Sequence, residues 1–191
     1  MLIAFNKPYG VLSQFTSDGT EKPTLARFGF PPHVYPIGRL DADSEGLLLL
    51  SDEPHWNKRL LHPRQAHPRT YLAQVEGTPS NLALGLLKRG LVIRGYRTRP
   101  CQAKILTSDP QLPERIPPIR FRKTVPTAWL EITLTEGKNR QVRRMLAAVG
   151  HPCLRLVRVK IGLFFLDGLE VGEWKVLSPA EEDMVLARPT P

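Results

Sequence analysis

Several short apolar runs along the chain have the length and spacing of β-strands. The run Gly46–Leu50 is continuous, which is typical of a strand buried on both faces. Apolar residues occupy alternate positions of Thr127–Thr135, which predicts a strand with one buried face. The other predicted strands are Leu2–Phe5, Tyr71–Val75 and Leu154–Leu166. The chain is therefore expected to contain a sheet.

Three segments have apolar residues at helical spacing. Asn81–Gly90 predicts a helix that ends at Gly90, and Asn139–Val149 predicts one followed by Gly150. A shorter helix is predicted at Pro54–Leu61. The residues expected to face inward on the first two helices are Leu82, Leu86, Leu87, Val142, Met145, Leu146 and Val149. Strands interrupted by single helices, without regular β-α-β alternation, favour an α+β fold with a mixed, largely antiparallel central sheet flanked by helices and loops.

Two segments lack such periodicity. Ser108–Pro126 contains five prolines and several basic residues, so we expect a long arm, and long loops in compact domains are often functional. Whether this arm becomes ordered only on binding is left open by the sequence. The acidic tail after Ser178 also contains proline, and we expect it to fray.

The composition is that of a folded protein. With 191 residues and 41% hydrophobic residues, we expect one domain spanning 1–191, divided into lobes near 1–62 and 63–191 around a central cleft. The sequence has no apolar run of membrane-spanning length, and its first residues do not resemble a signal peptide. We therefore expect a cytoplasmic protein without membrane attachment. Cys101 and Cys153 are interpreted as small core residues.

Positive charge is concentrated in one part of the chain. The formal net charge is +9, and 54–160 contains 21 Lys and Arg against 5 Asp and Glu. Such an asymmetry is typical of proteins that bind a polyanion, nucleic acid before membrane. The alternative is a generic solvated surface.

The segment Gly38–Gly46 combines three acidic residues, Asp41, Asp43 and Glu45, with Arg39. Charges this close to a core strand require partners or a chemical role. A solvated turn is one alternative. A metal site is another, although the segment lacks the later glycine and bidentate glutamate of a calcium loop.

This segment resembles the catalytic motif of the RsuA-type pseudouridine synthases. GRLD at 38–41 followed by GLLLLS at 46–51 matches that motif, and Asp41 stands at its catalytic aspartate. NKPYG at 6–10, RTY at 69–71 and GKNRQVRRM at 137–145 match three further motifs of the family, and RVKIG closes the similarity at 158–162. The resemblance implies the pseudouridine synthase fold and isomerisation of uridine to pseudouridine in RNA, without a cofactor or a metal.

Within the family, FNKPYGVLSQFT near the start and the segment 117–145 are most similar to the E-type subgroup, which acts on bacterial large-subunit (23S) ribosomal RNA. Many relatives carry an N-terminal S4 RNA-binding domain. The catalytic motifs begin here at residue 6, so we expect no S4 domain. The resemblance implies ribosomal RNA, or an assembly intermediate of the large subunit, as partner, and we expect a monomer.

The same resemblance assigns roles to individual residues. Asp41 would act as nucleophile or electrostatic catalyst, and Arg143 would pair with it. Tyr71 would lie against the uracil, or simply pack. Arg39 would enter the space left by the flipped uridine, or support the loop. Ile161 would line the base pocket, or belong to the core.

Other basic residues are candidates for RNA binding. Lys7 is interpreted either as structural or as a phosphate contact. The remaining candidates are Arg64, Arg69, Arg115, Arg120, Arg122, Lys123, Arg140 and Arg144. A nonenzymatic RNA-binding or ribosome-assembly module on the same fold is an alternative. A nuclease or glycosidase that uses Asp41 with Asp43 or Glu45 is a second alternative, which strand scission or sensitivity to chelators would reveal.

Overall fold

The computed structural model describes residues 1–119 and 125–188, and these form two compact units. Unit 1 consists of Met1–His67 together with the segment that begins at Val157, and unit 2 is Pro68–Leu156. The first boundary lies close to the expected one at 62. The C-terminal segment was expected in the second lobe but belongs to unit 1. The sequence did not show this, because strand pairing between the two ends of the chain leaves no trace in local periodicity.

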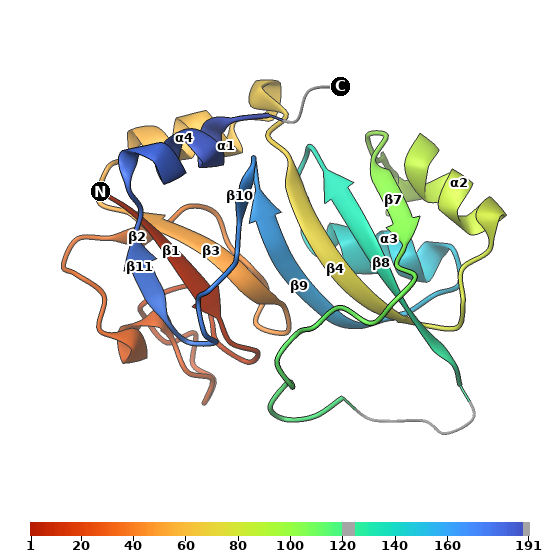
Figure 1. Cartoon of the computed structure of the whole chain (residues 1–191), viewed down its shortest axis with the longest axis horizontal. Coiled ribbons are helices and arrows are strands. Elements are labelled where there is room, and N and C mark those ends of the chain that lie inside the picture. The colour runs from red at the N-terminus through yellow and green to blue at the C-terminus, as the bar shows by residue number, and fades with distance from the viewer. Residues whose placement is uncertain (120–124, 189–191) are drawn as a thin grey trace. The chain divides into compact units, whose positions relative to one another are not determined.

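The sheet of unit 1 is built on two buried strands, β1 (Leu2–Lys7) and β3 (Glu45–Ser51), which pair antiparallel along their length. All residues of both strands are buried, as the continuous apolar run predicted for the second. On one side β1 pairs with β11 (Trp174–Val176), and on the other β3 pairs in parallel with the last part of β9 (Cys153–Ile161) (Figure 1). The N-terminal and C-terminal segments therefore share one sheet.

Two short strands and two helices complete unit 1. Tyr35–Pro36 (β2) pairs with β3, and Phe164–Phe165 (β10) pairs with β9. The helices are α1 (His55–Leu61) and α4 (Pro179–Leu186), with short 3-10 turns at Leu25–Phe28 and Pro63–Gln65. Trp56 and Leu60 of α1 and Val185 of α4 belong to the core cluster that covers β1 and β3.

The expectation that the tail after Ser178 frays is wrong for the residues up to 188, and residues 189–191 lie outside the described part of the chain. The Ser178 hydroxyl accepts a hydrogen bond from the backbone amide of Glu181, and the Glu181 carboxylate accepts from the backbone amide of Ser178. Lys175 adds an ion pair to Glu181 at 2.6 Å. This capping box begins α4, and Val185 packs it onto the core. In the sequence, the Ser-x-x-Glu spacing at 178–181 was the signal for this capping box.

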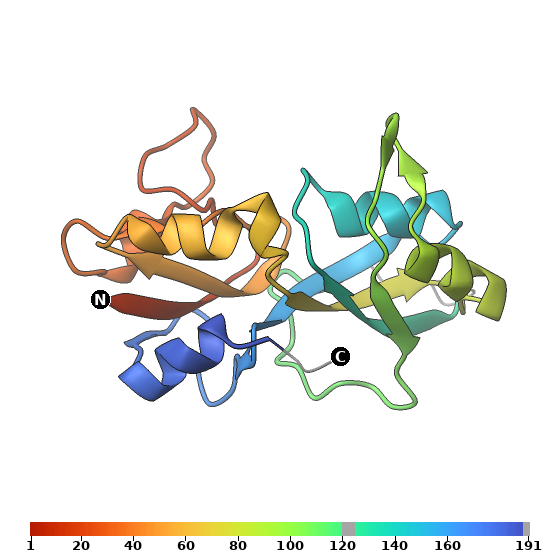
Figure 2. The ribbon, with the colours of Figure 1, turned by 90° about the horizontal axis from the view of Figure 1, so that it is seen from above.

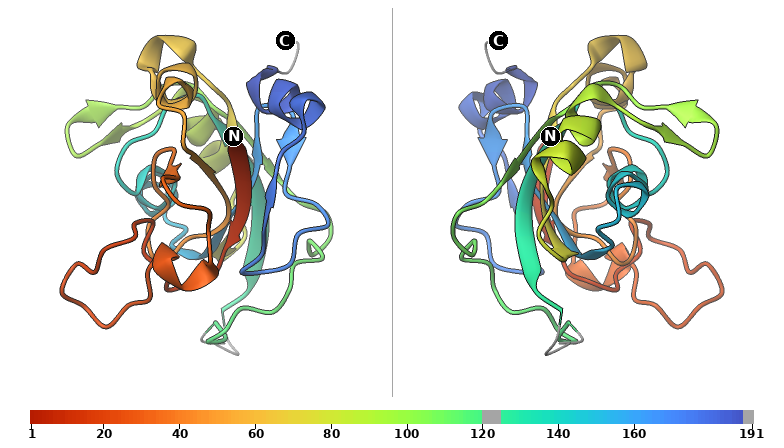
Figure 3. Two further views of the ribbon diagram at one scale, coloured as in Figure 1. Left: turned by 90° about the vertical axis from the view of Figure 1, so that its left-hand side faces the viewer. Right: turned by 90° about the vertical axis from the view of Figure 1, so that its right-hand side faces the viewer.

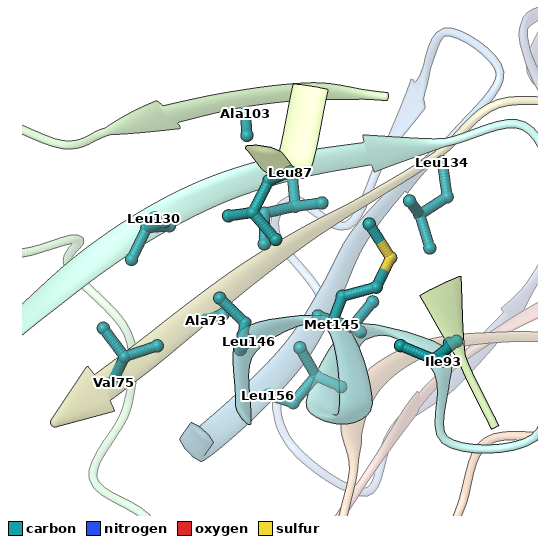
Figure 4. Close-up of a cluster of buried hydrophobic side chains, with 12 residues drawn as sticks. Ala73, Val75, Leu87, Ile93, Ala103, Leu130, Leu134, Met145, Leu146 and Leu156 are labelled. Atoms are coloured by element: carbon teal, nitrogen blue, oxygen red, sulfur yellow. The ribbon is translucent and has the colours of Figure 1, made fainter. Parts of the chain in front are cut away.

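Unit 2 contains a sheet in which β4 (Arg69–Glu76) lies between β9 and β8 (Thr127–Leu134), followed by β7 (Gln102–Ile105). The pairs β4–β8 and β8–β7 are antiparallel. One face is covered by α3 (Gln141–Ala148), and its side chains join those of β4 and β8 in a continuous apolar cluster (Figure 4). The prediction of an α+β fold with a largely antiparallel sheet is confirmed.

The helix α2 (Asn81–Arg89) buries Leu87, as expected, but not the other two residues that were predicted to face inward. Ala83 and Leu87 are buried, whereas Leu82 is 70% exposed and Leu86 is 40% exposed. Both pairs have the i, i+4 spacing of a helical face, so spacing alone does not choose between them. Cys101 and Cys153 are likewise only half-buried, at the edge of the apolar cluster.

The described part of the proline-rich arm is attached to unit 2. A guanidinium nitrogen of Arg155 in β9 donates a hydrogen bond to the carbonyl of Pro113 at 2.9 Å. Together with Gln74 and Trp129 of the sheet, residues of the arm line a pocket of about 300 Å³. These contacts attach the described part of the arm to the sheet of unit 2.

Gly162 is predicted to be a sensitive position of unit 1. It has a positive φ of 61°, and a Cβ there would lie 2.2 Å from the carbonyl oxygen of Val185 in α4. Gly168 has nearly the same φ, 63°, with open space around it. We expect Gly168→Ala to lower the free energy of unfolding by about 1 kcal/mol. Gly162→Ala should lower it by about 2 kcal/mol more, because α4 must move.

Urea unfolding of the two variants measures this difference. Equal losses of stability would contradict the proposed close packing of α4 on Gly162.

Candidate active site

The loop that carries Asp41 is held in place on both sides of this residue. Before it, the backbone amide of Leu40 donates to the Ser13 hydroxyl at 3.1 Å, and that hydroxyl donates to the Leu40 carbonyl at 2.8 Å. After it, the backbone amide of Gly10 donates to the carbonyl of Ala42 at 2.7 Å. Asp41 itself is half-buried. The motif NKPYG at 6–10 is thus hydrogen-bonded directly to the loop that carries Asp41.

The buried side chain of Lys7 holds the loop formed by residues 8–11. Its side chain is fully buried, with an exposed fraction of 0%. The ammonium nitrogen donates hydrogen bonds to the carbonyls of Pro8 and Val11, each at 2.8 Å. An ammonium group in this position is not available to a phosphate, so its contacts agree with the structural alternative for Lys7.

The surroundings of Lys7 carry several charges. Burial lowers its pKa from 10.5 to about 7, although the carboxylates of Glu45, Asp43 and Asp41 each act to raise it, and Arg158 acts to lower it. These three carboxylates are the acidic residues that stood out in the sequence. Their negative potential therefore acts on a buried cation of the same unit, which gives the acidic loop a partner.

The strand that follows the loop begins at a close backbone contact. Gly46 has a φ of 95°, and a Cβ there would lie 2.4 Å from the backbone oxygen of Arg158 in β9. The Arg158 side chain is buried and donates from Nε to the carbonyl of Leu47 at 2.7 Å. Glycine is therefore required where the loop joins β3, and a buried arginine lines this junction.

Two further predicted residues of unit 1 differ in accessibility. Arg39, directly before Leu40, is exposed and can reach a ligand in solvent. Ile161 is only 4% exposed and packs in the core cluster with Leu2 and Leu49. This packing agrees with the core alternative for Ile161.

Tyr71 and Arg143 belong to unit 2. Tyr71 lies on β4 opposite Ile132 of β8, is half-buried and packs against the apolar cluster. Arg143 lies on α3 and donates from Nη1 to the carbonyl of Cys153 at 3.1 Å. Packing and this hydrogen bond give both side chains a defined orientation within the unit.

The start of α3 depends on Glu136, which the sequence analysis did not single out. The Gln141 amide nitrogen donates to the Glu136 carboxylate at 2.6 Å, and the backbone amide of Lys138 donates to the Gln141 amide oxygen at 3.0 Å. Arg140, with a φ of 52°, is exposed, and Arg144 is half-buried and bonds to Asn139. In the sequence, the only signal for a role of Glu136 was its place directly before the motif GKNRQVRRM.

The other basic candidates lie in different settings. Arg64 is exposed and Arg69 is half-buried. Arg115 donates to the carbonyls of Pro117 and Pro118 within its own arm. Arg120, Arg122 and Lys123 lie outside the described residues, so their expected contact with RNA stays a prediction.

Within residues 1–119 and 125–188, no group of three or more His, Cys, Asp or Glu side chains is arranged to hold a metal ion. Over the same residues, no helix has the length and apolar character needed to cross a bilayer.

Lys7 is predicted to make stability depend on pH. Because the pKa of Lys7 is about 7 in the folded chain and has its ordinary value of 10.5 in the unfolded chain, the unfolded chain binds more protons between these values. The free energy of unfolding therefore rises with pH across that window. Lys7→Met removes this contribution, so the stability of the native chain relative to the variant should increase from pH 7 to about 10.

Urea unfolding at a series of pH values measures the effect. Lys22→Met, at an exposed lysine, is the control and should leave the pH dependence unchanged. Parallel pH curves for the native chain and Lys7→Met would contradict the assignment.

Comparison with known proteins identifies the family. The model of the RNA pseudouridylate synthase family matches residues 1–148. The chain is 55% identical over 177 residues to "Ribosomal large subunit pseudouridine synthase E" of Xanthomonas campestris, covering 92% of this chain and 95% of that protein. It is 37% identical over 176 residues to "Ribosomal large subunit pseudouridine synthase B" of Bacillus subtilis, covering 92% of this chain and 67% of that protein.

A solved structure supports the same conclusion. The "Crystal structure of pseudouridylate synthase" matches with a TM-score of 0.79 and 28% identity, over 96% of this chain and 73% of that one. The motifs at 6–10, 38–51, 69–71 and 137–145 fall within the matched part of the sequence. The similarity to RsuA-type enzymes inferred from these motifs is therefore confirmed, and the chain belongs to the RNA pseudouridylate synthase family.

Proposed function

We propose that the chain converts a specific uridine of bacterial large-subunit ribosomal RNA to pseudouridine, with Asp41 as the catalytic carboxylate. The observation that carries the proposal is the loop of Asp41, whose backbone is fixed on both sides while the side chain stays half-buried. The relatives named as large-subunit enzymes support the choice of RNA. A prepositioned carboxylate is what a reaction through a charged intermediate requires.

The reaction rearranges bonds without a net change in atoms. The bond between N1 of uracil and C1′ of the ribose breaks, the base rotates, and a bond forms between C5 and C1′. The proton on C5 leaves and N1 gains one. The carboxylate of Asp41 either attacks the substrate or stabilises the positive charge that develops as the glycosidic bond breaks.

The other residues would support this carboxylate and the base. We propose that the Arg143 guanidinium pairs with Asp41 in the working enzyme, which keeps the carboxylate ionised. Tyr71 would pack against the uracil and assist removal of the C5 proton. Arg39, exposed beside Asp41, would occupy the place of the extruded uridine.

Two other functions remain as alternatives to be tested. A nonenzymatic RNA-binding module would explain the basic charge but would not require Asp41. A nuclease or glycosidase would use Asp41 with Asp43 or Glu45 and would release fragments or free base. A cytoplasmic monomer without membrane attachment, acting on free RNA or on an assembly intermediate, stays our expectation.

Replacement of Asp41 is predicted to abolish catalysis. With unmodified large-subunit RNA tritiated at C5 of uracil, Asp41→Asn should lower tritium release by at least about 10³-fold, because the amide carries no charge. RNA binding should persist. Asp167→Asn, at an exposed carboxylate of the same unit, is the matched control. Release by Asp41→Asn at the native rate would exclude this residue as the catalyst.

Substitutions of two neighbouring arginines of α3 are predicted to change different kinetic constants. Arg143→Met should lower kcat by about 10²-fold with little change in KM, because it acts on the catalytic carboxylate. Arg144→Met should raise KM by about 5-fold with kcat retained, because it contacts the RNA backbone. Steady-state tritium release separates the two constants. A change of KM alone in Arg143→Met would contradict its proposed pairing with Asp41.

A further inference from the structure

A second stretch of positive charge lies outside the motifs of the family. Residues 77–108 contain six lysines and arginines and no acidic residue. All six are exposed: Lys88, Arg89, Arg94, Arg97, Arg99 and Lys104. Lys104 forms an ion pair with Glu131 at 3.0 Å, and the charge of Arg99 acts on the Glu136 carboxylate. Such a density of exposed positive charge is typical of a surface that binds a polyanion.

Three of these arginines belong to a projecting hairpin. Strands β5 (Val92–Ile93) and β6 (Tyr96–Arg97) pair antiparallel around Arg94 and Gly95, and Arg99 lies two residues after β6 (Figure 3). Both turn residues have positive φ values, 49° for Arg94 and 74° for Gly95. Asn or Gly is favoured at the first of these positions, and an arginine there costs about 1 kcal/mol. An arginine is thus held at the tip despite local strain.

The hairpin is anchored to the beginning of α3 through Glu136. The Tyr96 hydroxyl and the backbone amide of Arg99 both donate to the Glu136 carboxylate, the latter at 2.8 Å. Gln141 at the start of α3 donates to the same carboxylate. Burial acts to raise the pKa of Glu136, but these hydrogen bonds outweigh it and hold the pKa below its usual value. Glu136 is therefore ionised and connects the hairpin to the start of α3 through these hydrogen bonds.

Apolar packing and a cation contact reinforce this attachment. Ile93 of the hairpin lies in the same buried cluster as Met145 of α3 (Figure 4). The Lys138 ammonium lies 4.9 Å from the centre of the Tyr96 ring. Hairpin and helix lie on the same face of the sheet of unit 2 (Figure 2). The cations of the hairpin and those of the α3 motif are consequently held in one rigid arrangement.

We propose that these two elements form a single surface that binds the phosphodiester backbone of RNA. This hairpin surface consists of Arg94, Arg97, Arg99, Lys138, Arg140 and Arg144. The hairpin surface extends the expected RNA contacts from the motif at the start of α3 to the hairpin. The identity of the RNA rests on the proposed function. Guanidinium groups bind phosphates through directed hydrogen bonds and ion pairs, and a row of them follows a backbone irrespective of its sequence.

The test compares two variants that lose the same charge. The hairpin variant carries Arg94→Gln, Arg97→Gln and Arg99→Gln. The control carries Lys22→Gln, Arg27→Gln and Lys58→Gln, at exposed cations of unit 1. Binding to unmodified large-subunit RNA is measured over a series of salt concentrations. We expect the hairpin variant to bind at least about 10-fold more weakly, with a salt slope reduced by about 2, or about 0.7 for each lost contact.

The control variant should keep at least half of the native affinity. Equal weakening of both variants would overturn the proposal, because net charge alone would then explain it. An unchanged affinity of the hairpin variant would also overturn it. The same would hold if the hairpin substitutions reduced binding to vesicles with anionic headgroups but not to RNA.

Tritium release separates this proposal from the proposed function. At saturating RNA the hairpin variant should retain the native kcat, because it loses affinity and not chemistry. A fall in kcat at saturation would contradict a role confined to binding. If the native chain binds RNA but releases no tritium, the proposed function fails, while the comparison of the two variants still decides the hairpin surface.

Discussion

The buried amino group of Lys7 makes the hydrogen bonds on which the candidate site of unit 1 depends. Lys7 is withdrawn from solvent and held by two backbone carbonyls, and the loop that it fixes holds the Asp41 loop in turn. Taking a cation out of water is costly unless opposite charge lies near. Asp41, Asp43 and Glu45 offset part of this cost, and burial still lowers the pKa of Lys7 to about 7. The acidic loop and the early lysine motif are therefore two parts of one electrostatic arrangement.

The two units of this chain carry different functional groups. Unit 1 provides a carboxylate on a supported loop, and unit 2 provides guanidinium groups on α3 and on the hairpin. Strand β9 contributes residues to both. Within unit 2, Arg155 of this strand binds the proline-rich arm, and within unit 1, Arg158 binds β3. Buried arginines that bond to backbone carbonyls thus fix the segments next to the functional loops in each unit.

The features that sequence predicted are those with a strong local signal. The continuous apolar run of β3 and the spacing of Val142, Met145 and Leu146 on α3 are examples. The features that it missed arise from tertiary contacts. Two equivalent helical faces were available on α2, and packing on the sheet chose the one with Leu87. Glu136 became recognisable only once Tyr96, Arg99 and Gln141 were seen around it.

The central claim is that this chain isomerises uridine in ribosomal RNA. The most direct measurement is chromatographic analysis of the nucleosides of unmodified large-subunit RNA after incubation with the native chain, together with the length of the recovered RNA. We predict that uridine is lost and pseudouridine appears in equal amount, at one mapped position, in RNA of full length. Strand scission, free uracil or an unchanged nucleoside composition would contradict it.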